Sequence, residues 1–345
     1  MSITTTAVLR PRPQVQVRDA EQGLQRQLEH RVTLAWSLIL FNVLAFATNL
    51  TILHIPPTIG QVLTQGALPL GVLAALAANP KVVVRPGFFL FLVSLLAIEA
   101  VLTCLNAQYL RGTAYRTFRL AEFAAALWLL SPYFGRRDLL LVRVHLKALT
   151  VVLATVLLGL LVAPGRAMVN GRLSGVLWPI PSTQVAHYAA ITLGLVVVLW
   201  FSGLARGKIT AVAVVFAGAI LLLTHTRTAL GALLAALAVA GLSLIVARAR
   251  VRRLFAVIGG VAAVAAVGLS GFITSWLARG QGTQTLLGLS GRTNYWAQVL
   301  GEPRNKFEEL FGFGLNNAQY NGHPIDSNWI VSYQEQGLFG VTICA

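Results

Sequence analysis

Apolar segments of similar length recur along most of this 345-residue chain, separated by shorter polar segments. From residue 32 onward they are about 20 residues long, the length that an α-helix needs to cross the hydrocarbon core of a bilayer. We predict ten such helices, near residues 32–53, 58–78, 87–106, 115–134, 139–163, 183–203, 208–224, 228–247, 254–275 and 327–345. The pattern therefore predicts an all-α fold, a polytopic bundle of transmembrane helices.

The composition favours a membrane protein over a soluble one. The chain is 56% hydrophobic and 11% charged, whereas a typical soluble domain carries about 25% charged residues. The two cysteines, Cys104 and Cys344, lie inside apolar segments at a spacing that fits neither a metal site nor a disulfide framework. We therefore predict no soluble domain with its own core, and neither a metal nor another cofactor.

The polar segments divide the chain. The first 31 residues contain five arginines and show no cleavable signal peptide, so we predict a disordered cytoplasmic tail, with room for a short surface helix near residues 19–31. The chain ends inside an apolar segment, from which we expect the sequence to be incomplete and ten spans to be a minimum. The expected organisation is a tail (1–31), nine helices (32–275), one long loop (276–326) and a last visible helix (327–345).

The net charge of +16 becomes informative when the charged residues are assigned to the two sides of the membrane. With the amino terminus in the cytoplasm, 17 of the 27 lysines and arginines fall on the cytoplasmic side and ten outside. Cytoplasmic loops carry such an excess of Lys and Arg. The charge thus predicts a cytoplasmic amino terminus, an extracytoplasmic loop 276–326, and a lipid bilayer rather than a nucleic acid as partner. The ten lysines and arginines on the outer side oppose this cytoplasmic excess, so we expect them to have a functional role.

One of these outer cations, Arg227, lies within the apolar segment "LLLTHTRTALGALLAAL" (221–237). A charged side chain at bilayer depth costs several kcal/mol unless it is paired or faces water. It could simply extend to the interface from a helix end. Three threonines and His225 lie within one turn of it, however, and that cluster favours anion binding.

The long loop holds a second group in "LARGQGTQTLLGLSGRTNYW" (277–296), where Arg279 and Arg292 each adjoin a glycine. "LSGRTNYW" is typical of a turn that enters a helix. A helix amino terminus with a nearby arginine binds phosphate well. The alternative is an ordinary extracytoplasmic loop.

A third group is "NGHPIDSNWIVSYQEQGLFG" (321–340), in which His323 and Asp326 precede the last predicted span. Either side chain could act as a general base. Asp326 is also a good helix cap, which is the alternative role. Glu335 lies inside the span, where an ionisable group is either functional or paired within the bundle.

In "YLRGTAYRTFRLAEF" (109–123), Arg116, Arg119 and Glu122 are spaced by three and share a helix face. An ion pair between Arg119 and Glu122 would leave Arg116 for a ligand. The isolated polar residues Glu99, His187, Asn42 and Asn49 are expected to form hydrogen bonds between helices.

Taken in order, these motifs resemble the O-antigen ligase and O-antigen polymerase superfamily. "GRLSGVLWPIPSTQVAHYAA" (171–190) is similar to its R-x-x-G segment, and the resemblance covers roughly residues 110–345. It implies an inverting, metal-independent glycosyltransferase of the C-type architecture in the bacterial cytoplasmic membrane. On the outer face, such enzymes transfer a glycan from a polyprenyl-pyrophosphate donor to an acceptor glycan. Ligase and polymerase activity both fit the motifs.

The resemblance also implies roles for individual residues. Arg227 matches the family's arginine at the outer end of a span, and Arg292 matches the arginine of its loop motif, so both would hold the pyrophosphate. The other candidates for that role are Arg279, Arg116 and Arg172. Counted back from "E-x-G-x-x-G", Asp326 aligns with the family's histidine, whereas His323 is three residues away. Asp326 is therefore the preferred base and His323 the alternative.

Two other functions remain open. A transporter or flippase for lipid-linked sugars would also need outer arginines, but should carry charged residues near mid-membrane on several helices and paired broken helices. The second open function is that of a non-catalytic membrane scaffold with a degenerate site.

Overall fold

The computed structural model describes residues 13–44, 52, 56–107, 109–245, 248–268, 292–316, 319–325 and 327–344. This part of the chain is almost entirely helical, with two short β-hairpins. The long helices are α1 (Pro13–Val43), α2 (Pro57–Ala78), α3 (Phe88–Thr103), α4 (Leu110–Leu130), α5 (Asp138–Val162), α7 (Ser182–Phe201), α8 (Gly207–Leu223), α9 (Arg227–Leu244), α10 (Ala249–Gly268) and α15 (Asn328–Cys344). Each of the ten predicted segments overlaps one of them.

The shorter elements connect these helices. They are the 3-10 helices η1 (Cys104–Asn106) and η2 (Ser131–Tyr133), the helices α6 (Pro164–Ala167), α13 (Arg292–Gly301) and α14 (Lys306–Phe311), and the strands β1 (Met168–Val169), β2 (Arg172–Leu173), β3 (Gln319–Tyr320) and β4 (His323–Pro324). β1 pairs with β2, and β3 with β4, both antiparallel.

Five helical segments of the described chain are long and apolar enough to cross a membrane. They are Thr58–Ala78, Phe88–Asn106, Asp138–Val162, Ser182–Phe201 and Arg227–Leu244. The apolar helix α8 is shorter, and α4 carries four charged residues. The fold is thus that of an all-α membrane protein, whereas ten crossings remain a prediction.

The amino-terminal helix departs from the prediction. α1 begins at Pro13, so the prediction of disorder is wrong for residues 13–18, and the helix considered near residues 19–31 is part of a longer one that continues into the bundle. Two long-range contacts hold this polar part of α1 against the bundle. Arg137 forms an ion pair with Glu29, and Arg31 Nη1 donates to the Ala77 carbonyl over 2.9 Å. These contacts link segments far apart in the chain, so the local polar pattern could not indicate them.

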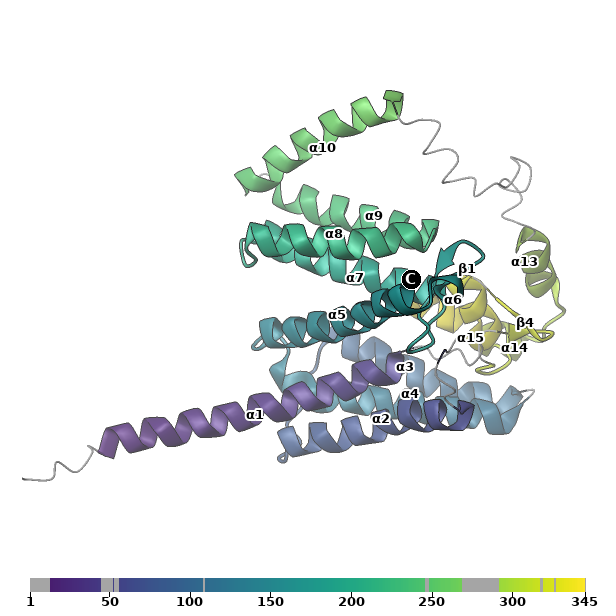
Figure 1. The fold of residues 1–345 in the computed structure, drawn as a ribbon. Helices are drawn as coiled ribbons and strands as arrows, with labels where there is room; N and C mark the ends of the chain where they lie inside the picture. Colours follow the sequence, from purple (N-terminus) through teal and green to yellow (C-terminus); the bar gives the residue numbers. More distant parts are fainter. Residues whose placement is uncertain are drawn as a thin grey trace, which may run out of the picture.

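The long helices lie side by side and alternate in direction, and two apolar clusters hold them together (Figure 1). One cluster joins α5, α7, α8 and α9 around fully buried side chains such as Leu153, Val185 and Ile220. The other joins α1, α2 and α4 around Ala35, Ile39 and Leu130. α1 also packs against α5 and links the two groups.

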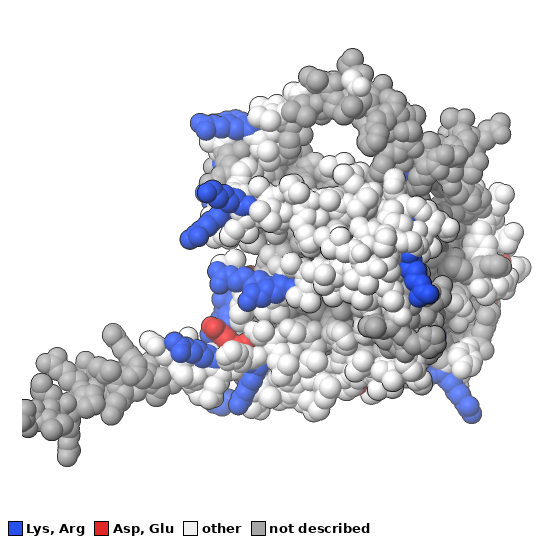
Figure 2. Space-filling model, in the orientation of Figure 1, with Lys and Arg blue, Asp and Glu red and all other residues white. Residues whose placement is uncertain are grey.

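The two ends of the bundle differ in charge. Figure 2 shows most of the visible Lys and Arg side chains at one end, on the left, where α5, α8 and α10 begin. Arg136, Arg206 and Arg248 directly precede or adjoin these helix starts. The β1–β2 hairpin, α13, α14 and β4 lie at the opposite end (Figure 1). A bundle that is basic at one end fits the predicted cytoplasmic side, and the orientation itself remains a prediction.

The predicted long loop is folded in its second half, where α13, α14 and the β3–β4 hairpin form. α14 packs against α15, and α15 packs against α3. α15 is interrupted at Gly337, whose φ of 62° lies in the left-handed region. Residues 269–291, the first part of the predicted loop, lie outside the described residues.

Candidate functional site

Arg227 is the first residue of α9, directly after the tight turn that follows α8. Thr224 and Thr226 in this turn are buried, at 0% and 4% exposed. The Thr224 hydroxyl donates to the Leu221 carbonyl over 2.6 Å. His225 adopts a positive φ of 50°, an uncommon conformation outside glycine that lets the chain reverse here.

Arg172, which lies on β2, reaches the same turn. Its Nε donates to the Thr224 carbonyl over 3.1 Å, and its Nη2 donates to Thr226 Oγ1, also over 3.1 Å. The fold therefore brings two predicted anion-binding arginines, Arg172 and Arg227, from separate segments to one turn. Arg172 uses two of its nitrogens to hold the turn in shape.

Arg227 is different, because its Nε and Nη2 are buried and have no hydrogen-bond partner within the described residues. Buried polar groups nearly always have a partner, and an unpaired buried charge is costly. The helix amino terminus adds its own partial positive charge at this position. The α8–α9 turn is thus suited to bind an anion, with Arg227 supplying the donors.

An apolar groove of about 410 Å³ runs between α7 and α9 and begins two residues beyond Arg227. Its lining side chains are His187, Ala190, Ile191, Gly194, Leu195, Val198, Ala229, Ala232, Leu233, Ala236 and Leu237. Small residues on both helices leave the depression open. His187 was expected to bond between helices, but it is exposed at this groove and has no partner in the described chain.

The arginines of α4 make contacts to other segments. Arg116 Nη1 donates to the Leu315 carbonyl over 2.9 Å, and Thr113 Oγ1 bonds to the same oxygen at 3.3 Å. Arg119 bonds to Asn42 of α1 and not to Glu122, so the expected ion pair does not form. Arg116 thus uses at least one donor to hold the chain that follows α14.

Glu99 and Glu335, two of the carboxylates predicted to lie inside spans, each have a hydrogen-bond partner. Gln336 Nε2 donates to Glu99 Oε2 over 2.6 Å, which joins α15 to α3 as expected. Glu335 Oε1 accepts the backbone N–H of Asn316 at 2.8 Å. Of the two roles considered for Glu335, the described structure supports pairing within the bundle.

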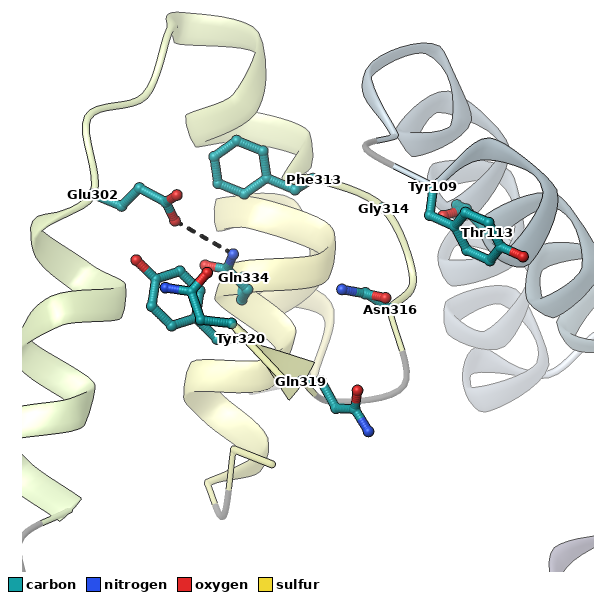
Figure 3. Close-up of a pocket in the computed structure, with 10 residues that line it drawn as sticks. Tyr109, Thr113, Glu302, Phe313, Gly314, Asn316, Gln319, Tyr320 and Gln334 are labelled. Carbon is teal, nitrogen blue, oxygen red and sulfur yellow. Dashed lines mark hydrogen bonds between the residues drawn. The ribbon is translucent and has the colours of Figure 1, made fainter. Parts of the chain in front are cut away.

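Beside this junction lies a polar pocket between α4, α15 and the chain around α13 and α14 (Figure 3). Its lining residues are Tyr109, Thr113, Glu302, Phe313, Gly314, Asn316, Gln319, Tyr320, Asn321 and Gln334. The Gln334 amide donates to Glu302 Oε2 at 3.5 Å, the dashed line in Figure 3. The motifs did not single out any of these residues as candidates, because they are ordinary polar and aromatic side chains scattered over 200 positions of the sequence.

Arg304 organises one wall of this pocket. Its guanidinium lies 4.8 Å from the centre of the Phe313 ring and 4.2 Å from that of Tyr333. It also donates to the Tyr333 carbonyl over 3.1 Å and to Gln334 Oε1. Because the carbonyl end of Gln334 is held in this way, its amide nitrogen faces Glu302. The sequence marked Arg304 only as one of the outer cations.

The remaining predicted site residues lie close to this pocket in the chain. His323 is on β4, where it pairs in register with Tyr320 of β3. Arg292 begins α13. The side chains of both lie outside the described residues, as do Asp326 and Arg279 entirely. Residues directly opposite on antiparallel strands have Cα atoms about 4.5–5.5 Å apart, so the backbone of His323 lies beside that of Tyr320, which lines the pocket.

The end of α1 contacts both α4 and α7. Asn42 accepts from Arg119 of α4, and the Val43 carbonyl accepts from Tyr188 of α7 at 3.4 Å. The Phe41 ring packs 5.5 Å from that of Trp178, which precedes α7. The β1–β2 hairpin and the α13–α14 region lie at the same end of the bundle (Figure 1).

Comparisons with protein-family models, curated proteins and solved structures found no match to this chain. The superfamily resemblance is therefore carried by the quoted motifs alone. Within the described ranges, no three His, Cys, Asp or Glu side chains lie close enough together to hold a metal ion.

Proposed function

We propose that this chain is a bacterial membrane glycosyltransferase, a polysaccharide polymerase or ligase. It transfers a glycan from a polyprenyl-pyrophosphate donor to an acceptor glycan on the outer face of the cytoplasmic membrane. The observation that carries this proposal is the α8–α9 turn, where Arg227 presents buried guanidinium nitrogens that have no partner in the described chain. A diphosphate supplies the negative charge and the acceptor oxygens that this arrangement lacks.

The charge on the donor explains why arginines suit this reaction. As the bond between the sugar and the pyrophosphate breaks, negative charge grows on the leaving oxygen. Fixed donors in a low-dielectric site stabilise that charge more than water does. Arg172 keeps the turn in shape through Thr224 and Thr226. In this proposal Arg292, at the start of α13, completes the pyrophosphate site.

The groove between α7 and α9 supports a lipid-linked donor. It begins at Ala229, two residues beyond Arg227 in α9, and its lining is apolar apart from His187. A molecule with a diphosphate head and a polyprenyl tail would occupy both features at once. Each buried CH₂ contributes about 0.8 kcal/mol, so the tail would supply much of the binding energy.

The acceptor's hydroxyl needs a base, and the segment before α15 supplies the candidates. Asp326 is preferred and His323 is the alternative. The base takes the proton as the acceptor oxygen bonds to the anomeric carbon, while the bond to the pyrophosphate breaks on the opposite side. A single displacement of this kind inverts the anomeric centre.

The test is transfer by the purified chain in proteoliposomes, with a polyprenyl-pyrophosphate glycan as donor and a glycan acceptor. Arg227→Ala should lower the rate about 10²–10³-fold, as expected when a donor to developing charge is lost. Arg227→Lys and Arg292→Lys should each cost at least about tenfold, because a point charge does not replace a planar, two-pronged donor. Arg166→Lys is the matched control, since Arg166 is exposed on α6 at the same end of the bundle.

Two outcomes would contradict the proposal. If both lysine variants transfer at the wild-type rate, the arginines do not bind the pyrophosphate. If the chain moves the lipid-linked donor across the bilayer and forms no transfer product, the transporter alternative is correct.

A further inference from the structure

The pocket in Figure 3 has a composition that is unusual for this chain. Of its ten described lining residues, four carry amide side chains (Asn316, Gln319, Asn321 and Gln334) and three are aromatic (Tyr109, Phe313 and Tyr320). Glu302 is the one charged residue among the ten. Amides both donate and accept hydrogen bonds, and so match hydroxyl groups, which do the same.

The wall of the pocket is held in place before any ligand arrives. The Arg304 guanidinium fixes Gln334, and Gln334 in turn bonds to Glu302. Tyr320 is supported from behind by Tyr295, whose hydroxyl donates to the Tyr320 carbonyl and whose ring lies 5.8 Å from the Tyr320 ring. Burial, with a smaller effect of the neighbouring Tyr320, raises the pKa of Tyr295, so the phenol remains a donor at neutral pH.

The size of the pocket limits what enters it. It encloses about 50 Å³, which is room for a few water molecules. A whole pyranose ring exceeds that space, whereas the hydroxyl-bearing edge of one fits. Tyr109 at the rim is 60% exposed, so its ring offers an apolar face to the C–H groups of a sugar lying across the opening.

The charge of the pocket limits the kind of sugar. No Lys, Arg or His is among its described lining residues, and Arg304 already bonds to Gln334 and the backbone. A carboxylate or phosphate on the ligand would meet Glu302 without a facing cation. Like charges at close range repel strongly where water is excluded.

We propose that this pocket binds the hydroxyl edge of an uncharged sugar and rejects acidic sugars through Glu302. Because β3, which pairs with β4, and Gln334 of α15 line the pocket, we assign the bound sugar to the acceptor rather than to the donor. This assignment to the acceptor rests on the proposed transferase function, whereas the selectivity for an uncharged sugar does not.

The experiment measures binding of simple glycosides to the full chain in detergent by saturation-transfer NMR, with no lipid-linked donor present. The probes are the methyl glycosides of glucose, galactose and mannose, with methyl glucuronide as the acidic counterpart. We expect at least one neutral glycoside to bind, and the glucuronide to bind about tenfold more weakly. Loss of one hydrogen bond to a hydroxyl in Asn316→Ala should weaken neutral binding by several-fold to about tenfold.

Glu302→Gln is the decisive variant, because it keeps the shape and removes the charge. It should bring glucuronide binding to within about threefold of the neutral glycoside. Glu309→Gln is the matched control, since Glu309 is exposed on α14 and outside the pocket, and it should preserve the tenfold difference. Thermal unfolding of each variant checks that the fold is intact.

The proposal is overturned if no neutral glycoside binds to the folded wild-type chain, or if Glu302→Gln leaves the discrimination unchanged. Because the donor is omitted, this result is separate from the transfer assay. Glycoside binding without transfer would contradict the transferase proposal and leave the pocket proposal standing. Transfer without glycoside selectivity would contradict the pocket proposal and leave the transferase proposal standing.

Discussion

At the scale of single residues, the two arginines at the α8–α9 turn have separate roles. Arg172 bonds to Thr224 and Thr226 and so stabilises the turn. Arg227 keeps buried donors that no described residue satisfies. A buried cation without a partner destabilises a protein by several kcal/mol. Such an arrangement persists where a ligand supplies the missing charge, which is why Arg227 carries the functional argument.

The base is also a residue-scale question, and Asp326→Asn addresses it. The amide keeps the shape of the side chain and loses its proton affinity, so transfer should fall about 10²–10⁴-fold. Binding of the lipid-linked donor should persist, because the pyrophosphate is held elsewhere. His323→Ala should cost much less.

Both rates can be measured in the reconstituted assay. Normal turnover of Asp326→Asn together with an inactive His323→Ala would reverse the assignment of the base.

At the scale of elements, α14 and α15 meet through backbone at two glycines. A Cβ on Gly337 would lie 2.4 Å from the Leu310 carbonyl carbon, and one on Gly312 would lie 2.5 Å from the Gln336 nitrogen. Both glycines have positive φ. The close approach positions Gln336 to bond with Glu99 of α3. This gives a physical reason for a glycine two residues after Glu335 in the "E-x-G" motif.

Gly337→Ala should therefore destabilise the protein. The added methyl group would clash with the α14 backbone, and the left-handed conformation would be strained, for a combined loss of at least about 2 kcal/mol. Thermal unfolding followed by tryptophan fluorescence would show the effect as a lower midpoint.

The control for this substitution is Gly231→Ala in α9, where a Cβ would meet nothing within 4 Å. It should change the midpoint little, since alanine is the better helix former. Equal effects of the two substitutions would show that the α14–α15 contact is not the cause.

At the scale of the whole molecule, one end of the bundle is strongly basic (Figure 2). The elements that form the two candidate sites meet at the opposite end (Figure 1). The connections α4–α5, α7–α8 and α9–α10 carry the basic residues. A lipid-linked donor displayed on the outer face requires the sites to face outward. The proposed function therefore depends on which end faces the cytoplasm.

Cysteine labelling tests this orientation. In a variant without Cys104 and Cys344, a membrane-impermeant reagent applied from outside should modify Gln284→Cys in the long loop. It should spare Ala249→Cys at the start of α10 until the membrane is permeabilised. The reverse pattern would place both sites in the cytoplasm and exclude the proposed reaction.

The sequence alone predicted the helices well and their contacts poorly. Each predicted apolar segment overlaps a helix, because apolar length is a local property that the order of residues displays directly. It did not indicate that α1 extends back to Pro13, or that Glu29 and Arg31 meet Arg137 and Ala77. It did not indicate that Arg116 bonds to Leu315, which lies about 200 positions away in the chain.

The sequence by itself thus determined the class of protein, the positions of the helices and the uneven charge of their connections. These follow from the cost of placing polar groups in hydrocarbon, which acts on each segment separately. Only the tertiary structure decided that Arg172 meets the turn before Arg227, that Gln336 reaches Glu99, and that residues between Tyr109 and Gln334 form one pocket. These contacts join segments that no periodicity relates, since they depend on how whole helices pack against one another.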